Sequence, residues 1–118
     1  MSDADLIDWL AGELAPLGHL SHRRMMGGHT LYLGGTVFAI IAGGELWFKA
    51  DAASDAVWDE AGHPRFTYEM GEGRTGTMNY RRAPDEVHDD NEALLRWAAL
   101  ALEAGRRGPA KRPAKKTD

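Results

Sequence analysis

The sequence predicts a two-layer α+β domain in which helices back one face of an antiparallel sheet. Apolar residues recur at helical spacing near both ends of the chain, and the short β-rich runs between them are separated by pairs of glycines. At 118 residues the chain is long enough for one domain with a single hydrophobic core. The predicted order of elements over residues 1–105 is α-β-β-β-α-β-β-α.

The first predicted element is a helix that begins at a cap formed by Ser2 or Asp3. Its apolar residues follow the i, i+3, i+4 spacing that places side chains on one helix face: Leu6, Trp9, Leu10 and Leu14. Pro16 and Gly18 mark its end. We expect this face to lie against the sheet.

Three strands are predicted next, as an antiparallel meander over residues 29–33, 36–42 and 45–50. The links Gly34-Gly35 and Gly43-Gly44 favour tight hairpins, because both turn residues can adopt positive φ. The middle run, TVFAIIA, is apolar at almost every position, which indicates a central strand that is covered on both faces.

Asp51 is predicted to cap a short helix whose spacing includes Ala53, Val57 and Ala61. Gly62 and Pro64 then end this helix. We expect about three helical turns.

A second hairpin is predicted over residues 64–70 and 74–81, around Gly71-Glu72-Gly73. Side chains alternate along a strand, so one face of this hairpin is expected to carry Phe66, Tyr68, Met70, Met78 and Tyr80.

The last predicted helix begins at a cap formed by Asp89 or Asp90, and Glu92 can complete a capping box. It ends at Gly105. Its buried stripe is predicted to contain Leu94, Trp97, Ala98, Ala101 and Leu102.

Residues 106–118 are predicted to form a disordered tail, because they contain two prolines and no large apolar side chain. Residues 1–105 carry a net charge of −9 and the tail +5. Sequence-independent contact with nucleic-acid phosphates is one expectation for the tail, with a slope of log K against log salt of about −5. A solvated tail explains the composition equally well. The six tail cations are Arg106, Arg107, Lys111, Arg112, Lys115 and Lys116.

The absence of cysteine excludes disulfides, thiolate metal sites and a cysteine nucleophile. The longest apolar run, 36–42, is too short to span a bilayer, and the acidic N-terminus does not resemble a signal peptide. We therefore expect a cytoplasmic protein without a membrane partner. No glycine-rich phosphate-binding motif leads from a strand into a helix.

The sequence gives no positive indication of a catalytic or cofactor site. His19, His22 and His29 lie close enough in sequence to leave zinc binding open, but their spacing matches no zinc motif. The acids near the last helix suit a helix N-terminus, where negative charge is favourable. We expect a protein that is not an enzyme and holds no metal or cofactor.

Four arginines are candidate interaction residues, since they flank predicted strands and are expected to converge at one sheet edge: Arg23, Arg24, Arg81 and Arg82. Edge protection by charge explains them as well. Arg23 at the start of the sheet can also bind carbonyls or a carboxylate. On that basis Arg23→Ala is expected to lower the melting temperature more than Arg24→Ala.

Four segments together resemble the TfoX/Sxy N-terminal domain family, over about residues 6–104: RRMMGGHTLY, FAIIAGGELWFKAD, AGHPRFTYE and MNYRRAPDEVHDDNEALLRWAALALEA. Met26 stands where the family usually has Phe, and Thr30 where many members have Gly. The positions that match the family pattern are Arg23, Met25, Gly27, Gly28, Leu31, Tyr32, Lys49, Asp51, Phe66, Tyr68, Pro84, Glu86 and Val87.

The resemblance implies an antiparallel sheet backed by helices, and a regulatory rather than a catalytic role. Full-length competence regulators of this family carry a second domain and act with a cyclic-AMP-responsive transcription factor to switch on DNA-uptake genes. This chain ends before such a domain, so we expect a stand-alone relative. The implied partner is a protein, a transcription regulator among the candidates, bound through the sheet or the Arg23/Arg24 region.

Overall fold

The computed structural model describes residues 2–25 and 27–108. Its strands form one antiparallel sheet of six, in the order β1-β2-β3-β4-β6-β5. The strands are β1 (Leu20–Met25), β2 (Gly28–Leu33), β3 (Thr36–Ala42), β4 (Glu45–Lys49), β5 (Arg65–Gly71) and β6 (Arg74–Arg82). The helices are α1 (Asp3–Glu13), α2 (Asp55–Glu60) and α3 (Asn91–Arg107), with 3-10 turns η1 (Ala15–Leu17) and η2 (Asp85–His88).

The predicted α+β class is confirmed, and the predicted elements occur in the predicted order. The structure adds β1, which pairs with β2 from Leu20↔Leu33 to Met25↔Gly28. Four of its six residues are exposed. A polar, exposed strand lacks the apolar alternation by which the other strands were found.

Local signals explain most element boundaries. Ser2 caps α1, with a capping box that it shares with Asp5. Asp90 caps α3 by accepting hydrogen bonds from the backbone N–H groups of Glu92 and Ala93. The glycine pairs after β2 and β3 all adopt positive φ, from 57° to 85°. They form the two predicted hairpin turns.

Two helix boundaries differ from prediction. The second helix begins at Asp55, with Ser54 as its N-cap, and it buries Trp58 rather than the predicted side that includes Val57. The large indole buries far more apolar surface than valine and alanines can, so it decides which side faces the sheet. The last helix continues past Gly105 to Arg107.

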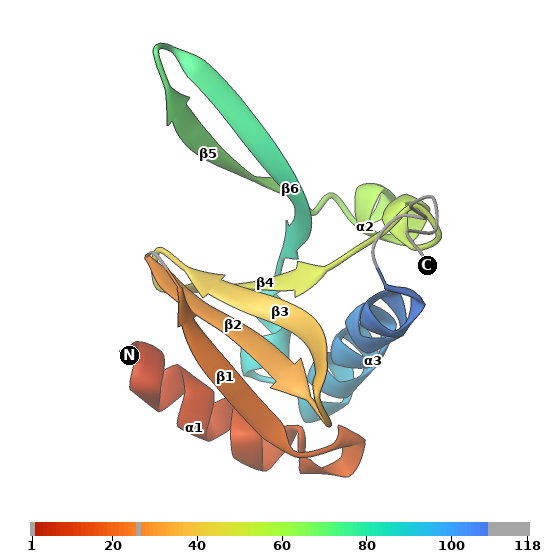
Figure 1. The fold of residues 1–118 in the computed structure, drawn as a ribbon. Helices are drawn as coiled ribbons and strands as arrows, with labels where there is room; N and C mark the ends of the chain where they lie inside the picture. The colour runs from red at the N-terminus through yellow and green to blue at the C-terminus, as the bar shows by residue number, and fades with distance from the viewer. Residues whose placement is uncertain (1, 26, 109–118) are drawn as a thin grey trace, which may run out of the picture.

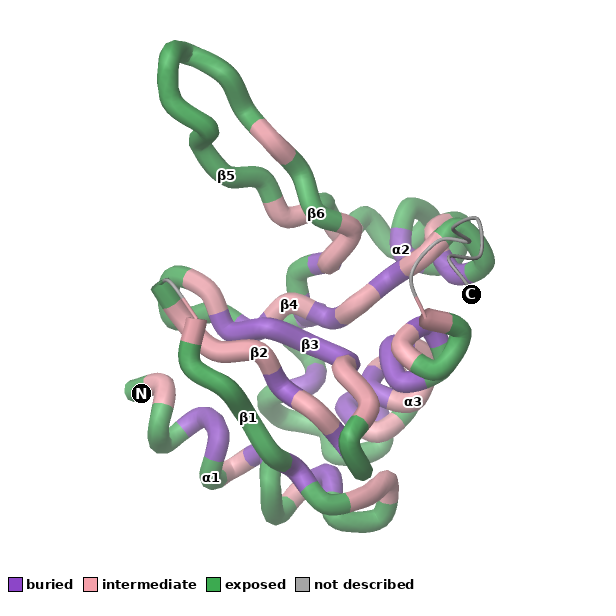
Figure 2. Tube along the Cα trace, in the orientation of Figure 1, coloured by how far each residue is buried: buried purple, intermediate pink, exposed green. Residues whose placement is uncertain are grey.

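The helices pack on one face of the sheet, here called the inner face. Their buried side chains form one hydrophobic cluster with inner-face residues such as Leu31, Ile41 and Phe48. As predicted, β3 is central, and it is buried from Phe38 to Ile41 (Figure 2). No helix within the described ranges is long and apolar enough to cross a bilayer.

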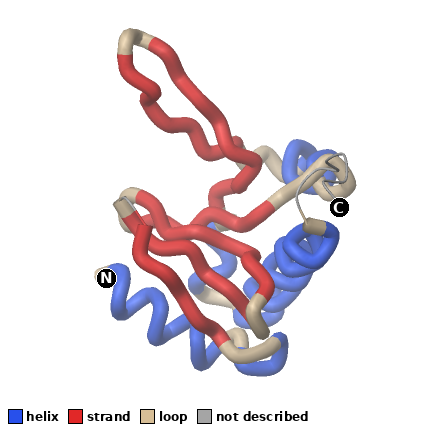
Figure 3. Tube along the Cα trace, in the orientation of Figure 1, coloured by secondary structure: helices blue, strands red, loops and turns tan. Residues whose placement is uncertain are grey.

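One part of the sheet stands clear of this core. The hairpin arm, defined here as β5 with residues 74–78 of β6, extends away from the helices (Figures 1 and 3). It is almost entirely exposed (Figure 2).

Candidate functional site

The outer face is the side of the sheet opposite the helices. Residues paired across antiparallel strands share a face, so the registers place five side chains in one row. This row crosses five strands through Arg23, Thr30, Ile40, Trp47 and Arg82. Ile40 is buried but lies outside the hydrophobic cluster of the inner face, consistent with its place on the opposite side.

Aromatic side chains make up the middle of the outer face. Alternation along the strands places Tyr32 and Tyr80 beside the row, and the ring centroids of Trp47 and Phe66 lie 5.1 Å apart, edge to face. Burial, together with the nearby Tyr32 hydroxyl, raises the pKa of Tyr80. The ammonium nitrogen of Lys49 lies 5.3 Å from the Tyr80 ring centroid, within cation–π range.

The Trp47 indole leaves a polar group without a partner. Its Nε1 atom is buried and has no hydrogen-bond partner among the described residues. Buried N–H groups are usually satisfied, so an unpaired one marks a place where an acceptor is missing. This donor lies among the aromatic side chains of the outer face.

Some residues of the family pattern lie on the outer face, and others support the fold. Arg23, Met25, Tyr32 and Lys49 all lie on the outer face, and the Met25 sulfur accepts a hydrogen bond of 3.3 Å from Thr30 Oγ1. Gly27 lies in the β1–β2 turn with φ of 80°. Two further residues of the pattern, Gly28 and Asp51, are structural.

Gly28 is a strand residue, whereas its neighbour Gly27 lies in the turn. It lies in β2 opposite Ala42, and a Cβ added to it would overlap the carbonyl oxygen of Ile41. The glycine is needed for close backbone approach, not for positive φ.

The prediction that four arginines converge at one edge is wrong. Arg23 lies on the edge strand β1 and Arg82 on β6, with three strands between them. Four strand spacings separate the two backbones by about 19 Å. Arg24 and Arg81 pair with His29 and Phe48, so they point to the inner face.

Arg81 is a buried structural residue rather than a surface contact. It is 1% exposed. Its guanidinium donates to Asp59 Oδ1 at 2.7 Å, to Asp55 Oδ1 at 2.9 Å and to the His63 carbonyl oxygen at 3.0 Å. Its Nε donates to Asn79 Oδ1 at 2.9 Å. These contacts hold α2 against the sheet. The two aspartates four residues apart on α2 were a sequence signal for this contact that was missed.

Arg23 lacks the stabilising contact expected for it. Neither its guanidinium nor that of Arg24 has a hydrogen-bond or ion-pair partner among the described residues, and both side chains are exposed. The structure therefore gives no reason for Arg23→Ala to lower the melting temperature more than Arg24→Ala.

Asp51 joins the start of the α2 region to the end of α3. It accepts hydrogen bonds from Arg107 Nε at 2.6 Å and Nη2 at 2.9 Å, and another from the Ser54 backbone N–H. The hydrogen bonds from Arg107 are the main cause of a lowered Asp51 pKa, against the opposing effect of burial.

Removing the contact between Arg107 and Asp51 is expected to lower the melting temperature by an amount that depends on pH. We expect Arg107→Ala to lower the melting temperature at neutral pH more than Arg106→Ala does. The folded-state pKa of Asp51 is depressed, so its contribution is present above the unfolded pKa of about 3.9 and is lost as pH falls through the folded value. Thermal melts from pH 7 to below about 3 should show that the larger loss of melting temperature in Arg107→Ala than in Arg106→Ala disappears at low pH. A loss that stays constant across this range would contradict the assignment.

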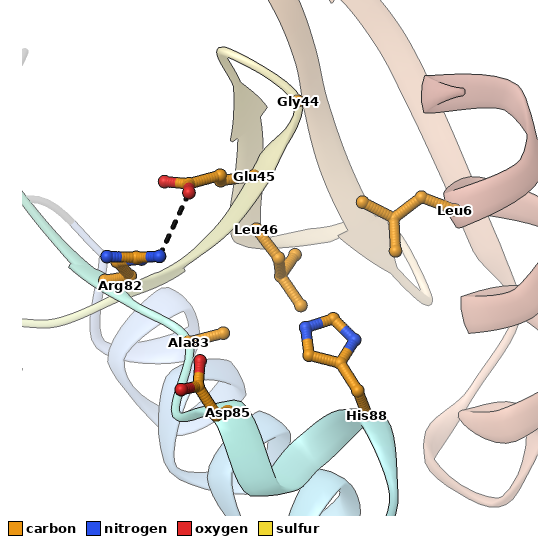
Figure 4. Close-up of a pocket in the computed structure, with 8 residues that line it drawn as sticks. All are labelled: Leu6, Gly44, Glu45, Leu46, Arg82, Ala83, Asp85 and His88. Atoms are coloured by element: carbon orange, nitrogen blue, oxygen red, sulfur yellow. Dashed lines mark hydrogen bonds and ion pairs between the residues drawn. The ribbon is translucent and has the colours of Figure 1, made fainter. Parts of the chain in front are cut away.

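A hollow of about 340 Å³ lies where β4, η2 and α1 meet (Figure 4). Its lining includes Arg82, which donates to Glu45 Oε2 at 3.0 Å. The His88 ring stacks on Trp9 at a centroid distance of 5.7 Å. These side chains already have partners, and we assign no ligand to the hollow.

The histidines are only partly brought together. The rings of His22 and His29 are 5.3 Å apart, and His29 Nε2 lies 3.8 Å from Asp3 Oδ2. His19 lies at the entry to β1. Within residues 2–25 and 27–108 no group of three or more potential ligands is arranged to hold a metal ion.

The basic tail falls largely outside the described residues. Arg106 and Arg107 belong to the last turn of α3, and Arg107 is bound to Asp51. Met26 also lies outside the described residues. Nucleic-acid binding by the tail stays a prediction, since the remaining cations are not described: Lys111, Arg112, Lys115 and Lys116.

Helices on one face of a six-stranded antiparallel sheet, an aromatic opposite face and a projecting hairpin define this as a small α+β module with an open sheet surface. The sequence matches the TfoX N-terminal domain over residues 13–105. It is also 31% identical over 91 residues to Protein Sxy of Escherichia coli (strain K12), an alignment covering 77% of this chain and 43% of that protein. The chain belongs to the TfoX N-terminal domain family. It spans less than half the length of this relative.

Proposed function

We propose that this chain is a non-enzymatic regulatory module of the cytoplasm that binds a protein partner through the outer face. The observation that carries the proposal is the buried, unpartnered Trp47 indole N–H among the aromatic side chains of the outer face. Because this N–H is buried in the free protein, a partner's acceptor would reach it only after neighbouring side chains move. The new hydrogen bond would then remove a desolvation cost that the free protein bears.

The charges on the outer face suggest what kind of surface the partner presents. Arg23 has no ion-pair partner among the described residues, and Lys49 lies over an aromatic ring. Both can meet acidic side chains, whereas Arg82 is already paired with Glu45. We therefore propose a partner with an acidic contact surface and exposed hydrogen-bond acceptors.

The family connects this binding role to gene regulation. The similarity to Protein Sxy and the TfoX N-terminal domain supports a role in the regulation of competence. For the partner we propose a transcription regulator. The contact would then be between two proteins, so the regulated DNA sequence would be read by the partner.

The test compares charge reversals on the two faces of the sheet. The wild-type chain and the Arg23→Glu/Lys49→Glu variant are immobilised and used to capture partners from the native cytoplasm after crosslinking. We expect the double reversal to weaken capture of a specific partner by about tenfold or more, because like charges would then meet across the interface.

Arg24→Glu is the matched control, since Arg24 is also exposed but points to the inner face of β1. It should leave capture unchanged. Equal capture by the wild-type chain and the outer-face variant, at equal melting temperatures, would reject the outer face as the contact surface.

A further inference from the structure

The hairpin arm exposes apolar surface away from the core. Three of the four large apolar side chains exposed in the described part of the chain belong to it: Tyr68, Met70 and Met78. Tyr68 packs over Gly76, where an added Cβ would come within 2.6 Å of its ring. The arm is therefore an ordered hairpin whose exposed apolar surface has no partner among the described residues.

The sheet has two edge strands, and they carry different charged side chains. β1 is one edge and β5 is the other. β1 carries the neighbouring cations Arg23 and Arg24, so pairing of β1 with a second β1 would bring like charges together. β5 carries Arg65 and Glu69, which have opposite charges and are both exposed.

The sequence of β5 is self-complementary about Thr67. In an antiparallel pair centred on this residue, Arg65 lies opposite Glu69 of a second copy, and Phe66 lies opposite Tyr68. The two-fold axis repeats both pairs and places the two threonines opposite each other. Opposite charges, aromatic pairs and threonine pairs are all favourable cross-strand neighbours.

The charged side chains in these pairs are available. Arg65 donates one hydrogen bond of 3.2 Å to Asp55 Oδ2, and its side chain is 44% exposed. A guanidinium has five N–H donors, so Arg65 can keep this contact and bind a second carboxylate. Glu69 has no hydrogen-bond or ion-pair partner among the residues described.

We infer that the occupant of the β5 edge is a second copy of this chain, which pairs antiparallel with β5 about Thr67 to form a closed two-fold dimer. The two sheets then join into one sheet of twelve strands. This inference does not depend on the proposed function, because it rests on the free edge of β5 and not on the unpartnered Trp47 N–H, although Phe66 borders both surfaces. The paired segment is short, so the dimer is weak and depends on concentration.

Charge reversal tests the register. Light scattering and sedimentation of the full chain, over a wide concentration series, are expected to show a monomer–dimer equilibrium. Glu69→Arg should shift it to monomer, because each Arg65 would then face an arginine. Arg65→Glu/Glu69→Arg should restore the dimer. A wild-type chain that stays monomeric, a Glu69→Arg variant that dimerises like wild type, or oligomers larger than dimers would overturn the inference.

A single cysteine provides a second test that leaves both ion pairs intact. The chain has no cysteine of its own, so any disulfide must join two copies. Thr67 residues facing across the axis would have Cα atoms about 4.5–5.5 Å apart, within the range of a disulfide. We expect Thr67→Cys to give a covalent dimer under mild oxidation.

Thr77→Cys is the matched control, because Thr77 is the cross-strand partner of Thr67 on β6 and is also exposed. In each copy β6 lies one strand further from the two-fold axis than β5. The Cα atoms of the two Thr77 residues would therefore be about 15 Å apart in the dimer. The control should not crosslink. Equal crosslinking of the two variants would show random collision and would overturn the inference.

Discussion

Replacing Arg81 with methionine is expected to lower the free energy of unfolding by about 3 kcal/mol, or the melting temperature by about 10 °C. The guanidinium is buried and binds Asp55, Asp59 and the His63 carbonyl oxygen. Methionine fills similar space but leaves the partly buried Asp55 carboxylate without its buried cation. The loss of a charge partner therefore dominates over the loss of packing. Chemical denaturation with two optical probes would measure the change.

Arg65→Met is the matched control for this prediction. Arg65 binds the same Asp55, but its side chain is 44% exposed, against 1% for Arg81. Exposed ion pairs contribute at most about 1 kcal/mol. If the two variants lost equal stability, burial would not be what makes Arg81 important, and its assignment as the residue that fastens α2 to the sheet would fail.

The parts of the fold that follow from local sequence were predictable. Gly34-Gly35 and Gly43-Gly44 set two hairpins, and both pairs have the positive φ that such turns require. The unbroken apolar run of β3 correctly indicated a central strand. In each case the signal lies within a few residues of the feature that it predicts.

The parts that depend on distant partners were not predictable in this way. The sequence of β1 is polar, and its strand conformation comes from pairing with β2. Whether Arg81 faces solvent or core depends on Asp55 and Asp59, more than twenty residues earlier in the chain. The order of the strands, which places β5 at an edge, is likewise a tertiary property.

The candidate site was predicted in part. Arg23, Tyr32 and Lys49 were selected by their match to a family pattern, and the strand registers place them on one face. The unpartnered N–H of Trp47 was not foreseen. The alternation of Glu45, Trp47 and Lys49 along β4 was the signal that could have separated the outer face from the inner one.

Gly28→Ala is expected to lower the free energy of unfolding by about 3 kcal/mol or more, or to abolish cooperative unfolding. The added methyl group would overlap the carbonyl oxygen of Ile41 on the neighbouring strand. A backbone oxygen in a paired strand cannot move aside as a side chain can, so β2 and β3 would have to separate. Thermal unfolding followed by circular dichroism measures the loss.

Two comparisons separate this cause from a general sensitivity to substitution. Gly12→Ala adds the same methyl group on α1 into open space, and should stabilise the protein by up to about 1 kcal/mol. Arg23→Ala, five residues before Gly28 in the same family pattern, should leave stability within about 0.5 kcal/mol, because its exposed side chain has no partner among the described residues. Strong destabilisation by Gly28→Ala alone would divide the pattern into a glycine that the fold needs and an arginine that is available for binding. Destabilisation by both would mean that Arg23 also supports the fold, and would weaken its place in the proposed contact surface.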